Sequence, residues 1–285
     1  MKKRGYIFHF FLMFAACAVL ACYMVIDRLS TDSVPPQIKM DEKEITLSIK
    51  DPKEKLLQGV SARDDEDGDV TDSLVIESVY GVTEDNRIVV SYAAFDKAGN
   101  VAKAERKVHY TDYENPKLTL NAPLAFAYGR NFDVLSIVGA TDVFEGDISN
   151  RVKATMLTGG KAISDEGIHG VHFRVTNSLG DTVQLVLPVE VYVSSGYDGK
   201  VELKDYLVYL PKGAGFQPNS YLKSFDYLDM SVDLTRGVPA NITVRHSGDV
   251  DTSTPGVYAV KYNVECEFNQ RKFTGFSKLI VVVEE

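Results

Sequence analysis

The sequence predicts an all-β protein in which three tandem β-sandwich domains follow an N-terminal transmembrane helix. Three observations support this prediction: an uncharged segment at the start of the chain, a pattern that recurs about every 80 residues, and short strands of alternating polarity between turns. Of the 285 residues, 45% are apolar and 25% are charged. This composition is sufficient for packed cores and excludes a disordered chain.

The first element runs from Gly5 to Ile26 and contains no charged residue. As a helix at about 1.5 Å per residue it would be roughly 33 Å long, enough for a bilayer core of about 30 Å. The cations Lys2, Lys3 and Arg4 precede it, and such cations favour a cytoplasmic N-terminus. We therefore predict a cell-membrane protein with a single pass, composed of a cytoplasmic tail (1–4), a transmembrane anchor (5–26), a linker (27–36) and extracellular C-terminal domains.

Two alternatives to an uncleaved anchor stay open. Val19-Leu20-Ala21-Cys22 is similar to a bacterial lipobox, in which Cys22 would carry the lipid, although apolar residues continue after it. A cleaved signal peptide normally has a shorter apolar core of about 7–15 residues. All three alternatives place the later domains outside the cytoplasm. Only Cys266 lies in those domains, and we expect it to be a small buried core residue.

An internal repeat defines the domains. Ungapped alignments match 62–71 with 140–149 and 92–100 with 173–181, and Pro36 and Pro116 open the two units 80 residues apart. A third copy is weaker: residues 209–216 are similar to 125–132, and 255–262 are similar to 167–174. The repeat predicts domains over 37–112, 113–194 and 195–285, of which the last is divergent.

Each unit has the two-residue period of β-strands. The apolar positions of this alternation are Ile88, Val90, Tyr92 and Ala94 in the first unit, Val171, Phe173 and Val175 in the second, and Tyr258, Val260, Tyr262 and Val264 in the third. Turns separate the strands: Asp96 can cap a turn through its side chain, and Gly99 can adopt a positive φ. We predict the same kind of turn at Gly180-Asp181 in the second unit. Short strands at roughly 8–12-residue spacing are typical of β-sandwiches.

Two motifs of the first unit carry a family resemblance. The pattern Ala62-x-Asp64-x-x-Asp67-Gly68-Asp69-Val70-Thr71 followed by Asp96-Lys97-Ala98-Gly99-Asn100 resembles the tandem bacterial Ig-like domains of Gram-positive surface proteins and pesticidal crystal toxins. The second unit keeps Glu145-Gly146-Asp147 but has Asn177 at the place of Asp96, and the third has Met230 where the turn glycine should stand. The resemblance implies three Ig-like domains in a modular surface array, and it supplies no catalytic residues.

The acidic turns are the candidate cation ligands. Asp64, Asp67 and Asp69 surround one glycine turn, and Asp142, Glu145 and Asp147 surround the next. Ca²⁺ prefers such hard oxygen ligands, usually about six to eight of them. Asp112-Tyr113-Glu114-Asn115-Pro116 also resembles the acidic linkers of cadherin-type arrays, in which Ca²⁺ stiffens the junction. The simpler interpretation is that these carboxylates cap and solvate turns, so we predict no metal or cofactor site and leave Ca²⁺ as the open alternative.

Charge and motifs exclude other functions. Residues 27–285 hold 28 basic and 40 acidic side chains, a net charge of −12, which argues against nucleic-acid binding. The histidines of this part, His109, His169, His172 and His246, lie near no nucleophile motif, so we predict no enzymatic activity.

A cluster of tyrosines in the third unit is the candidate ligand surface. Its members are Tyr197, Tyr206, Tyr209, Tyr221 and Tyr227. Exposed aromatic rings bind sugars or protein partners, but alignment with the second unit favours core packing for these. We expect a non-enzymatic stalk or adhesion module at the bacterial cell surface, with a protein or an envelope polysaccharide as its partner in addition to the membrane. The alternative is an accessory subunit of a cell-envelope or polysaccharide machinery.

Overall fold

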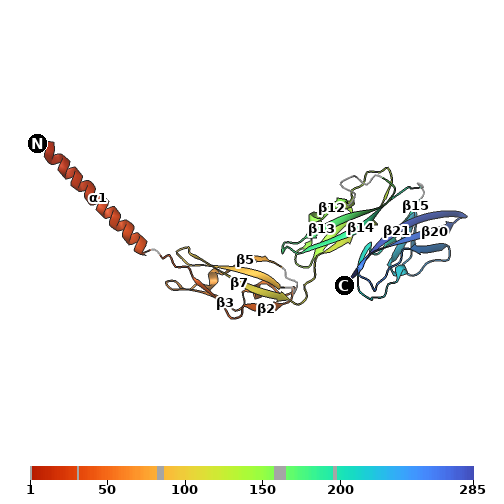
Figure 1. Ribbon diagram of the computed structural model, residues 1–285, viewed down its shortest axis with the longest axis horizontal. Coiled ribbons are helices and arrows are strands. Elements are labelled where there is room, and N and C mark those ends of the chain that lie inside the picture. Colours follow the sequence, from red (N-terminus) through yellow and green to blue (C-terminus); the bar gives the residue numbers. More distant parts are fainter. Residues whose placement is uncertain (1, 31, 82–86, 157–164, 195–197) are drawn as a thin grey trace. The chain divides into compact units, whose positions relative to one another are not determined.

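The computed structural model describes residues 2–30, 32–81, 87–156, 165–194 and 198–285 (Figure 1). Within these ranges, helix α1 (Lys2–Ser30) is the one α-helix, and strands and short 3₁₀ helices make up the other elements. The chain forms two compact units, Met1–Asp112 and Tyr113–Glu285. The predicted all-β fold is therefore confirmed for the part of the chain after α1.

The transmembrane anchor predicted over residues 5–26 is wrong. In the described part of the chain, no helix combines the length and the apolar character that crossing a membrane requires. The predicted single-pass localisation, with its cytoplasmic N-terminus and extracellular domains, is corrected accordingly.

The first unit is a β-sandwich of two sheets. Four strands pair in the order β2 (Glu44–Leu47), β7 (Val101–Tyr110), β6 (Arg87–Phe95), β5 (Val75–Tyr80), and three pair in the order β1 (Gln37–Met40), β3 (Val60–Asp64), β4 (Gly68–Asp69). The 3₁₀ helices η1 (Lys53–Leu57) and η2 (Thr71–Ser73) join them. The inward face predicted for β6 is confirmed, since Ile88, Val90, Tyr92 and Ala94 are at most 2% exposed. The alternation holds only in part, because Ser91 (7%) and Ala93 (4%) on the other face are buried as well.

Tyr92 ties the core of this sandwich to η1. Its side chain is fully buried, and its hydroxyl donates a hydrogen bond of 2.6 Å to the carbonyl oxygen of Leu56. Replacing Tyr92 with phenylalanine keeps the ring and leaves that buried carbonyl without its partner, so we expect the first sandwich to lose about 1–3 kcal/mol. Urea denaturation of the full chain measures the loss. Tyr80→Phe, at a position 40% exposed, is the control, and equal losses in the two variants would contradict the prediction.

The second sandwich repeats the plan of the first. One sheet has the order β11 (Gly146–Asp147), β10 (Val138–Asp142), β8 (Lys117–Leu120), and the other the order β12 (Lys153–Met156), β13 (Gly167–Thr176), β14 (Thr182–Tyr192), β9 (Ala125–Ala127). η3 (Val134–Ser136) and η4 (Ser149–Arg151) are its 3₁₀ helices. β9 pairs in parallel with β14 just as β2 pairs in parallel with β7. The acidic turn β3–β4–η2 recurs as β10–β11–η4, which confirms the repeat detected in the sequence.

The remaining strands form one seven-stranded sheet. Its order is β18 (Met230–Asp233), β17 (Leu222–Tyr227), β15 (Asp198–Leu203), β21 (Arg271–Glu284), β20 (Gly256–Phe268), β19 (Ile242–Ser247), and β16 (Leu207–Pro211) also pairs with β21. The 3₁₀ helix η5 (Pro218–Tyr221) precedes β17. Both β15 and β16 run parallel to β21. This strand order differs from the plan that the first two sandwiches share.

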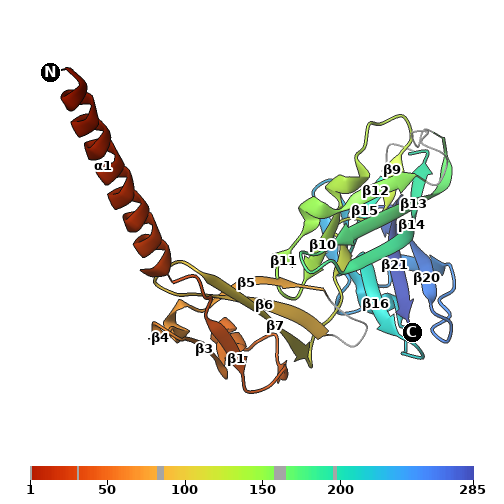
Figure 2. The same ribbon diagram turned by 60° about the vertical axis from the view of Figure 1, so that its left-hand side comes forward.

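Strand β21 belongs to two hydrophobic cores. Leu279, Val281 and Val283 pack with the core of the seven-stranded sheet. Ile280 and Val282, on the opposite face of the strand, pack with the core of the second sandwich. A strand that is buried on both faces requires a continuous apolar run, and residues 279–283 supply it. The second sandwich and the seven-stranded sheet therefore share a core within one compact unit, and Figure 2 shows the strands of these two parts next to each other. The domain boundaries 37–112, 113–194 and 195–285 stay a prediction.

A buried charge cluster links the same two parts. Lys278 of β21 is 3% exposed, and its Nζ donates to the carbonyl oxygen of Pro188 over 3.0 Å. Glu190 of β14 lies 3.7 Å from the same Nζ and 2.6 Å from Nζ of Lys261. Burial lowers the pKa of Lys278, and the Glu190 carboxylate acts against this shift.

Candidate functional site

The acidic turn of the first sandwich begins where β3 ends. Asp64 is 3% exposed, and its Oδ1 accepts the backbone N–H groups of Glu66 and Asp67, each over 2.9 Å. This is a side-chain cap that closes the tight turn before Gly68. The cap uses only one of the two carboxylate oxygens.

The other two carboxylates predicted around this turn have partners of their own. Asp67 accepts the backbone N–H of Lys97 over 2.7 Å and its ammonium over 3.0 Å, and these bonds lower the pKa of Asp67. Asp69 accepts the backbone N–H of Thr71 over 3.0 Å, and hydrogen bonds from Thr71 lower the pKa of Asp69. Both side chains therefore cap and brace the loop, as the simpler interpretation of the sequence holds.

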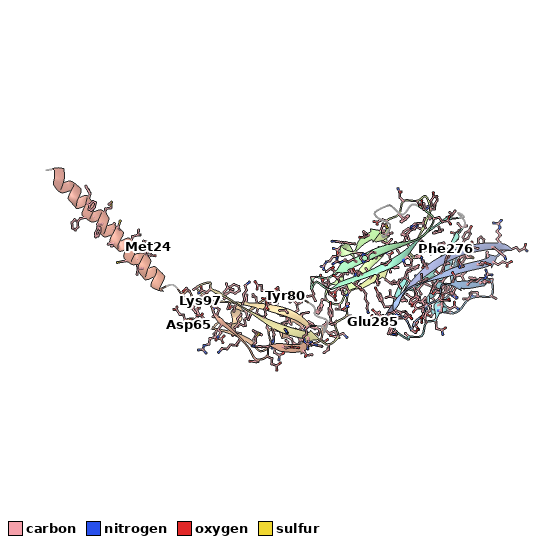
Figure 3. The ribbon with its side chains drawn as sticks, viewed as in Figure 1. Met24, Asp65, Tyr80, Lys97, Phe276 and Glu285 are labelled. Carbon is pink, nitrogen blue, oxygen red and sulfur yellow. The ribbon has the colours of Figure 1, made fainter. Side chains whose placement is uncertain are left out.

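Asp64 lies instead beside two aspartates from distant parts of the chain. One carboxylate oxygen each of Asp32, Asp64 and Asp96 lie within 4.8 Å of one another, and this is the one such acidic group among the described residues. Asp65 and Lys97, the sequence neighbours of two of them, lie at the same end of the first sandwich (Figure 3). The sequence analysis identified Asp96 only as a turn cap and did not identify Asp32. We name Asp32, Asp64 and Asp96 the aspartate triad.

Backbone groups position the rest of the triad. Asp96 Oδ1 accepts the N–H of Asn100 over 2.8 Å, while its Oδ2 accepts the Asn100 side-chain amide over 2.7 Å. The predicted turn is confirmed, because Gly99 has a φ of +90° and Gly180 in the second sandwich has a φ of +89°. Asp32 Oδ1 accepts the N–H of Val34 over 2.9 Å.

The corresponding turn of the second sandwich contains an amide. Asp142 Oδ1 accepts the N–H groups of Phe144 and Glu145 over 2.8 and 3.0 Å, which is the cap seen at Asp64. Asp142 Oδ2, however, accepts a hydrogen bond of 2.9 Å from the side-chain amide of Asn177. The same amide lies 3.0 Å from the hydroxyl of Tyr113. Every carboxylate oxygen of Asp142 therefore has a donor.

Glu145 and Asp147, the remaining predicted residues of this turn, are also paired within the protein. Glu145 binds the guanidinium of Arg151, and this contact lowers the pKa of Glu145. Asp147 Oδ1 accepts the N–H of Ser149 over 2.9 Å, and hydrogen bonds from Ser149 lower its pKa. Asp112 behaves in the same way, since it accepts the Ser48 hydroxyl over 2.7 Å and the Ile49 N–H over 2.8 Å.

The tyrosines near the start of the third unit belong to the cores. Tyr206 is 9% exposed, and Tyr221 and Tyr227 pack against the same core. Tyr209 accepts the N–H of Leu118 over 3.0 Å and donates to its carbonyl, and burial raises the pKa of Tyr209 to about 12. The core-packing expectation is confirmed for these four; Tyr197 lies outside the described residues.

Cys266 and two of the histidines make contacts within the protein. Cys266 is 1% exposed, as predicted, and burial raises the pKa of its thiol. His246 packs edge-on against the ring of Tyr262 at 5.0 Å, and His169 Nε2 lies 2.8 Å from the carbonyl oxygen of Asp165.

A cationic hollow lies on the second sandwich. It has a volume of about 370 Å³ and is lined by Arg151, Lys153, Arg174 and Thr176. Lys153 of β12 and Arg174 of β13 are direct cross-strand partners, and neither has an ion-pair partner among the described residues. Like charges placed directly opposite each other destabilise a sheet. The pairing of Lys153 with Arg174 therefore does not serve stability and favours a role in binding.

Comparisons with known proteins give no family. No family model and no curated protein matches the chain. Solved structures that resemble it include the CBM51-2 and INT domains of Clostridium perfringens ZmpB in complex with GlcNAc (18% identity, 54% of this chain and 26% of that one, TM-score 0.23). Mouse cadherin-23 EC22-24 (12% identity, 88% and 99%, TM-score 0.22) and the protocadherin GammaB4 extracellular domain (11% identity, 87% and 49%, TM-score 0.20) are two others. The chain thus spans about a quarter of the first and half of the last, and likeness at this level assigns neither family nor function.

Proposed function

We propose that the chain is a non-enzymatic binding module whose second sandwich recognises an acidic polysaccharide. The cationic hollow is the observation that supports this function. Lys153 and Arg174 are exposed cations on neighbouring strands of an otherwise acidic protein, and Arg151 and Thr176 complete the lining. Guanidinium and ammonium groups at such spacing suit the carboxylates or sulfates of an acidic sugar chain.

The core shared through β21 supports a rigid presentation of this surface. Ile280 and Val282 pack into the second sandwich from a strand of the seven-stranded sheet. A binding surface held on regular strands loses little conformational freedom when its ligand binds.

The test is the affinity of the full chain for polygalacturonate compared with neutral dextran, measured by biolayer interferometry. We expect binding to the acidic polymer alone, with a dissociation constant that rises when the salt concentration is raised from about 50 to 200 mM, because exposed charges are screened over roughly 10 Å. Reversing both charges with Lys153→Glu and Arg174→Glu should weaken binding at least about tenfold.

The matched control is Lys212→Glu, at an exposed lysine of the same compact unit. It should leave the affinity within about twofold, since Lys212 does not line the hollow and an exposed charge outside a binding site contributes little. Equal affinity for dextran, or equal weakening by Lys212→Glu, would exclude the proposed site. Co-purification of the chain with an envelope protein, and no binding to the acidic polymer, would favour the accessory-subunit alternative.

A further inference from the structure

We propose that Asp32, Asp64 and Asp96 form a Ca²⁺ site in the first sandwich. The three residues lie in separate segments: Asp32 follows α1, Asp64 ends β3, and Asp96 follows β6. Their carboxylate oxygens nevertheless lie within 4.8 Å of one another. Two ligands on opposite sides of a Ca²⁺ ion are about 4.6–5.2 Å apart, because each lies 2.3–2.6 Å from the ion. The spacing of the triad therefore suits this ion.

The triad contains carboxylate oxygens that the protein does not satisfy. Asp64 is 97% buried, yet no donor among the described residues reaches its Oδ2. Asp32 Oδ2 is buried and has no partner in that part of the chain either. The backbone holds the Oδ1 atom of each residue in place, so the second oxygen is directed by a fixed side chain. Buried acceptors in proteins are almost always paired, and an unpaired buried carboxylate is costly, so these two oxygens suit a cation as their partner.

The charge around the triad is also uncompensated. The ammonium of Lys97 binds Asp67, outside the triad. The carboxylates of Asp32, Asp64 and Asp96 repel one another at the spacing given above. A divalent cation would remove this repulsion and complete the coordination of the orphan oxygens.

The second sandwich provides an internal comparison. Asn177 stands where the first sandwich has Asp96, and its amide donates to Asp142 Oδ2, the counterpart of the unpaired Asp64 Oδ2. The aspartate that corresponds to Asp32 is Asp112, whose carboxylate is used by Ser48 and Ile49. In the second sandwich, an amide hydrogen of Asn177 thus lies next to the second carboxylate oxygen of the capping aspartate. In the first sandwich, three carboxylates surround the corresponding place. The same scaffold offers a cation site in one repeat and a neutral hydrogen bond in the other.

A bound ion would join the segment after α1 to the sandwich. Asp32 lies two residues beyond Ser30, the last residue of the helix. Its segment is already attached by the Asn100 amide, which donates to the carbonyl oxygens of Asp32 and Val34 over 3.3 and 3.4 Å. Ca²⁺ would add ligands from this segment to those of the two turns. The site would therefore act on the order of the linker as well as on the stability of the sandwich.

The test is calorimetric titration of the full chain, stripped with chelator and kept in mild detergent, with CaCl₂ and separately with MgCl₂. We expect one Ca²⁺ site with a dissociation constant on the order of 10⁻³ M or tighter, and weaker binding of Mg²⁺, which demands shorter and near-octahedral coordination. Asp96→Asn should weaken Ca²⁺ binding at least about tenfold. This variant is expected to fold, because Asn177 Oδ1 caps the equivalent turn by accepting the N–H of Asp181, as Asp96 Oδ1 accepts the N–H of Asn100.

The matched control is Asp65→Asn, which removes the same charge from an exposed position of the same turn. It should bind Ca²⁺ within about threefold of the unmodified chain, because screening weakens the effect of an exposed charge. A second readout is the melting temperature, which Ca²⁺ should raise in the unmodified chain and in Asp65→Asn but not in Asp96→Asn. No Ca²⁺ binding up to about 10 mM, tighter binding of Mg²⁺, or equal loss in Asp65→Asn and Asp96→Asn would each overturn the proposal.

Discussion

Replacing Glu190 with glutamine is expected to destabilise the unit 113–285 by about 3–5 kcal/mol at pH 7, one of the two largest effects anticipated for this protein. The substitution keeps the shape of the side chain and removes the only carboxylate that contacts Lys278 among the described residues. The ammonium of Lys278, which is 3% exposed, would then be buried without a counter-charge and beside the cation of Lys261. Chemical denaturation of the full chain measures the loss.

The pH dependence of this variant has a definite sign. Burial lowers the pKa of Lys278 below its ordinary value of 10.5. Between the folded and unfolded pKa values the unfolded chain binds more protons, so the free energy of unfolding rises with pH through that window. Glu190→Gln removes the carboxylate that opposes this lowering, so the pKa of Lys278 in the folded variant falls further. The pH range over which the free energy of unfolding rises then begins at a lower pH. The deficit of the variant should therefore shrink as the pH is raised from 7 toward 10.

A second substitution separates charge from packing. Lys278→Met in the Glu190→Gln background removes the buried charge and keeps most of the side-chain volume, so it should recover most of the lost stability. A deficit that is independent of pH and not recovered by Lys278→Met would show that Glu190 acts through packing and not through charge.

Phe225→Ala is expected to cost about 3–5 kcal/mol, the other large effect. Phe225 of β17 is fully buried, and its ring lies against Gly199 of β15 and Gly275 of β21. A Cβ atom on Gly199 would lie 2.4 Å from the ring, so the two glycines form a notch in the sheet that only this ring fills. Removing the ring leaves a cavity that the paired backbones of β15 and β21 cannot close.

The control for this prediction is Phe268→Ala, at a ring that is 50% exposed. Its cost should be below about 1 kcal/mol, because little apolar surface returns to water. Gly199→Ala tests the notch from the other side: the added methyl group should be destabilising in the presence of Phe225 by overpacking, by about 1–3 kcal/mol. Thermal unfolding of the full chain measures all three variants, and similar losses for Phe225→Ala and Phe268→Ala would refute the account.

The sequence predicts the first two sandwiches well because their signals are local. Alternation identifies one buried face of β6 and of β13, and one capping side chain with one glycine predicts the Asp96–Asn100 turn. The run Leu279–Val283 lacks this alternation, since both of its faces are buried, and so the shared core of the last two sheets has no period-two signature.

The aspartate triad escapes sequence reasoning for a different reason. Asp64, Asp67 and Asp69 are close in the sequence, but Asp67 is hydrogen-bonded to Lys97 and Asp69 to the backbone N–H of Thr71. The residues that do converge lie 32 positions apart, and only the folded chain brings them to one end of the sandwich. The anchor prediction over residues 5–26 rested on the absence of charged residues alone, and no helix in the described part of the chain is long and apolar enough to cross a membrane.

The position of β21 also sets an order of events during synthesis. The strands of the first sandwich all lie between Gln37 and Tyr110, so this part can fold while later residues are still being made. The second sandwich cannot complete its core until Ile280 and Val282 have left the ribosome, about 90 residues after its own last strand. Its partly exposed core must wait through that interval, and parallel pairing of β15 and β16 with β21 makes the final closure slow. The unit 113–285 is therefore expected to need chaperone protection that the first sandwich does not.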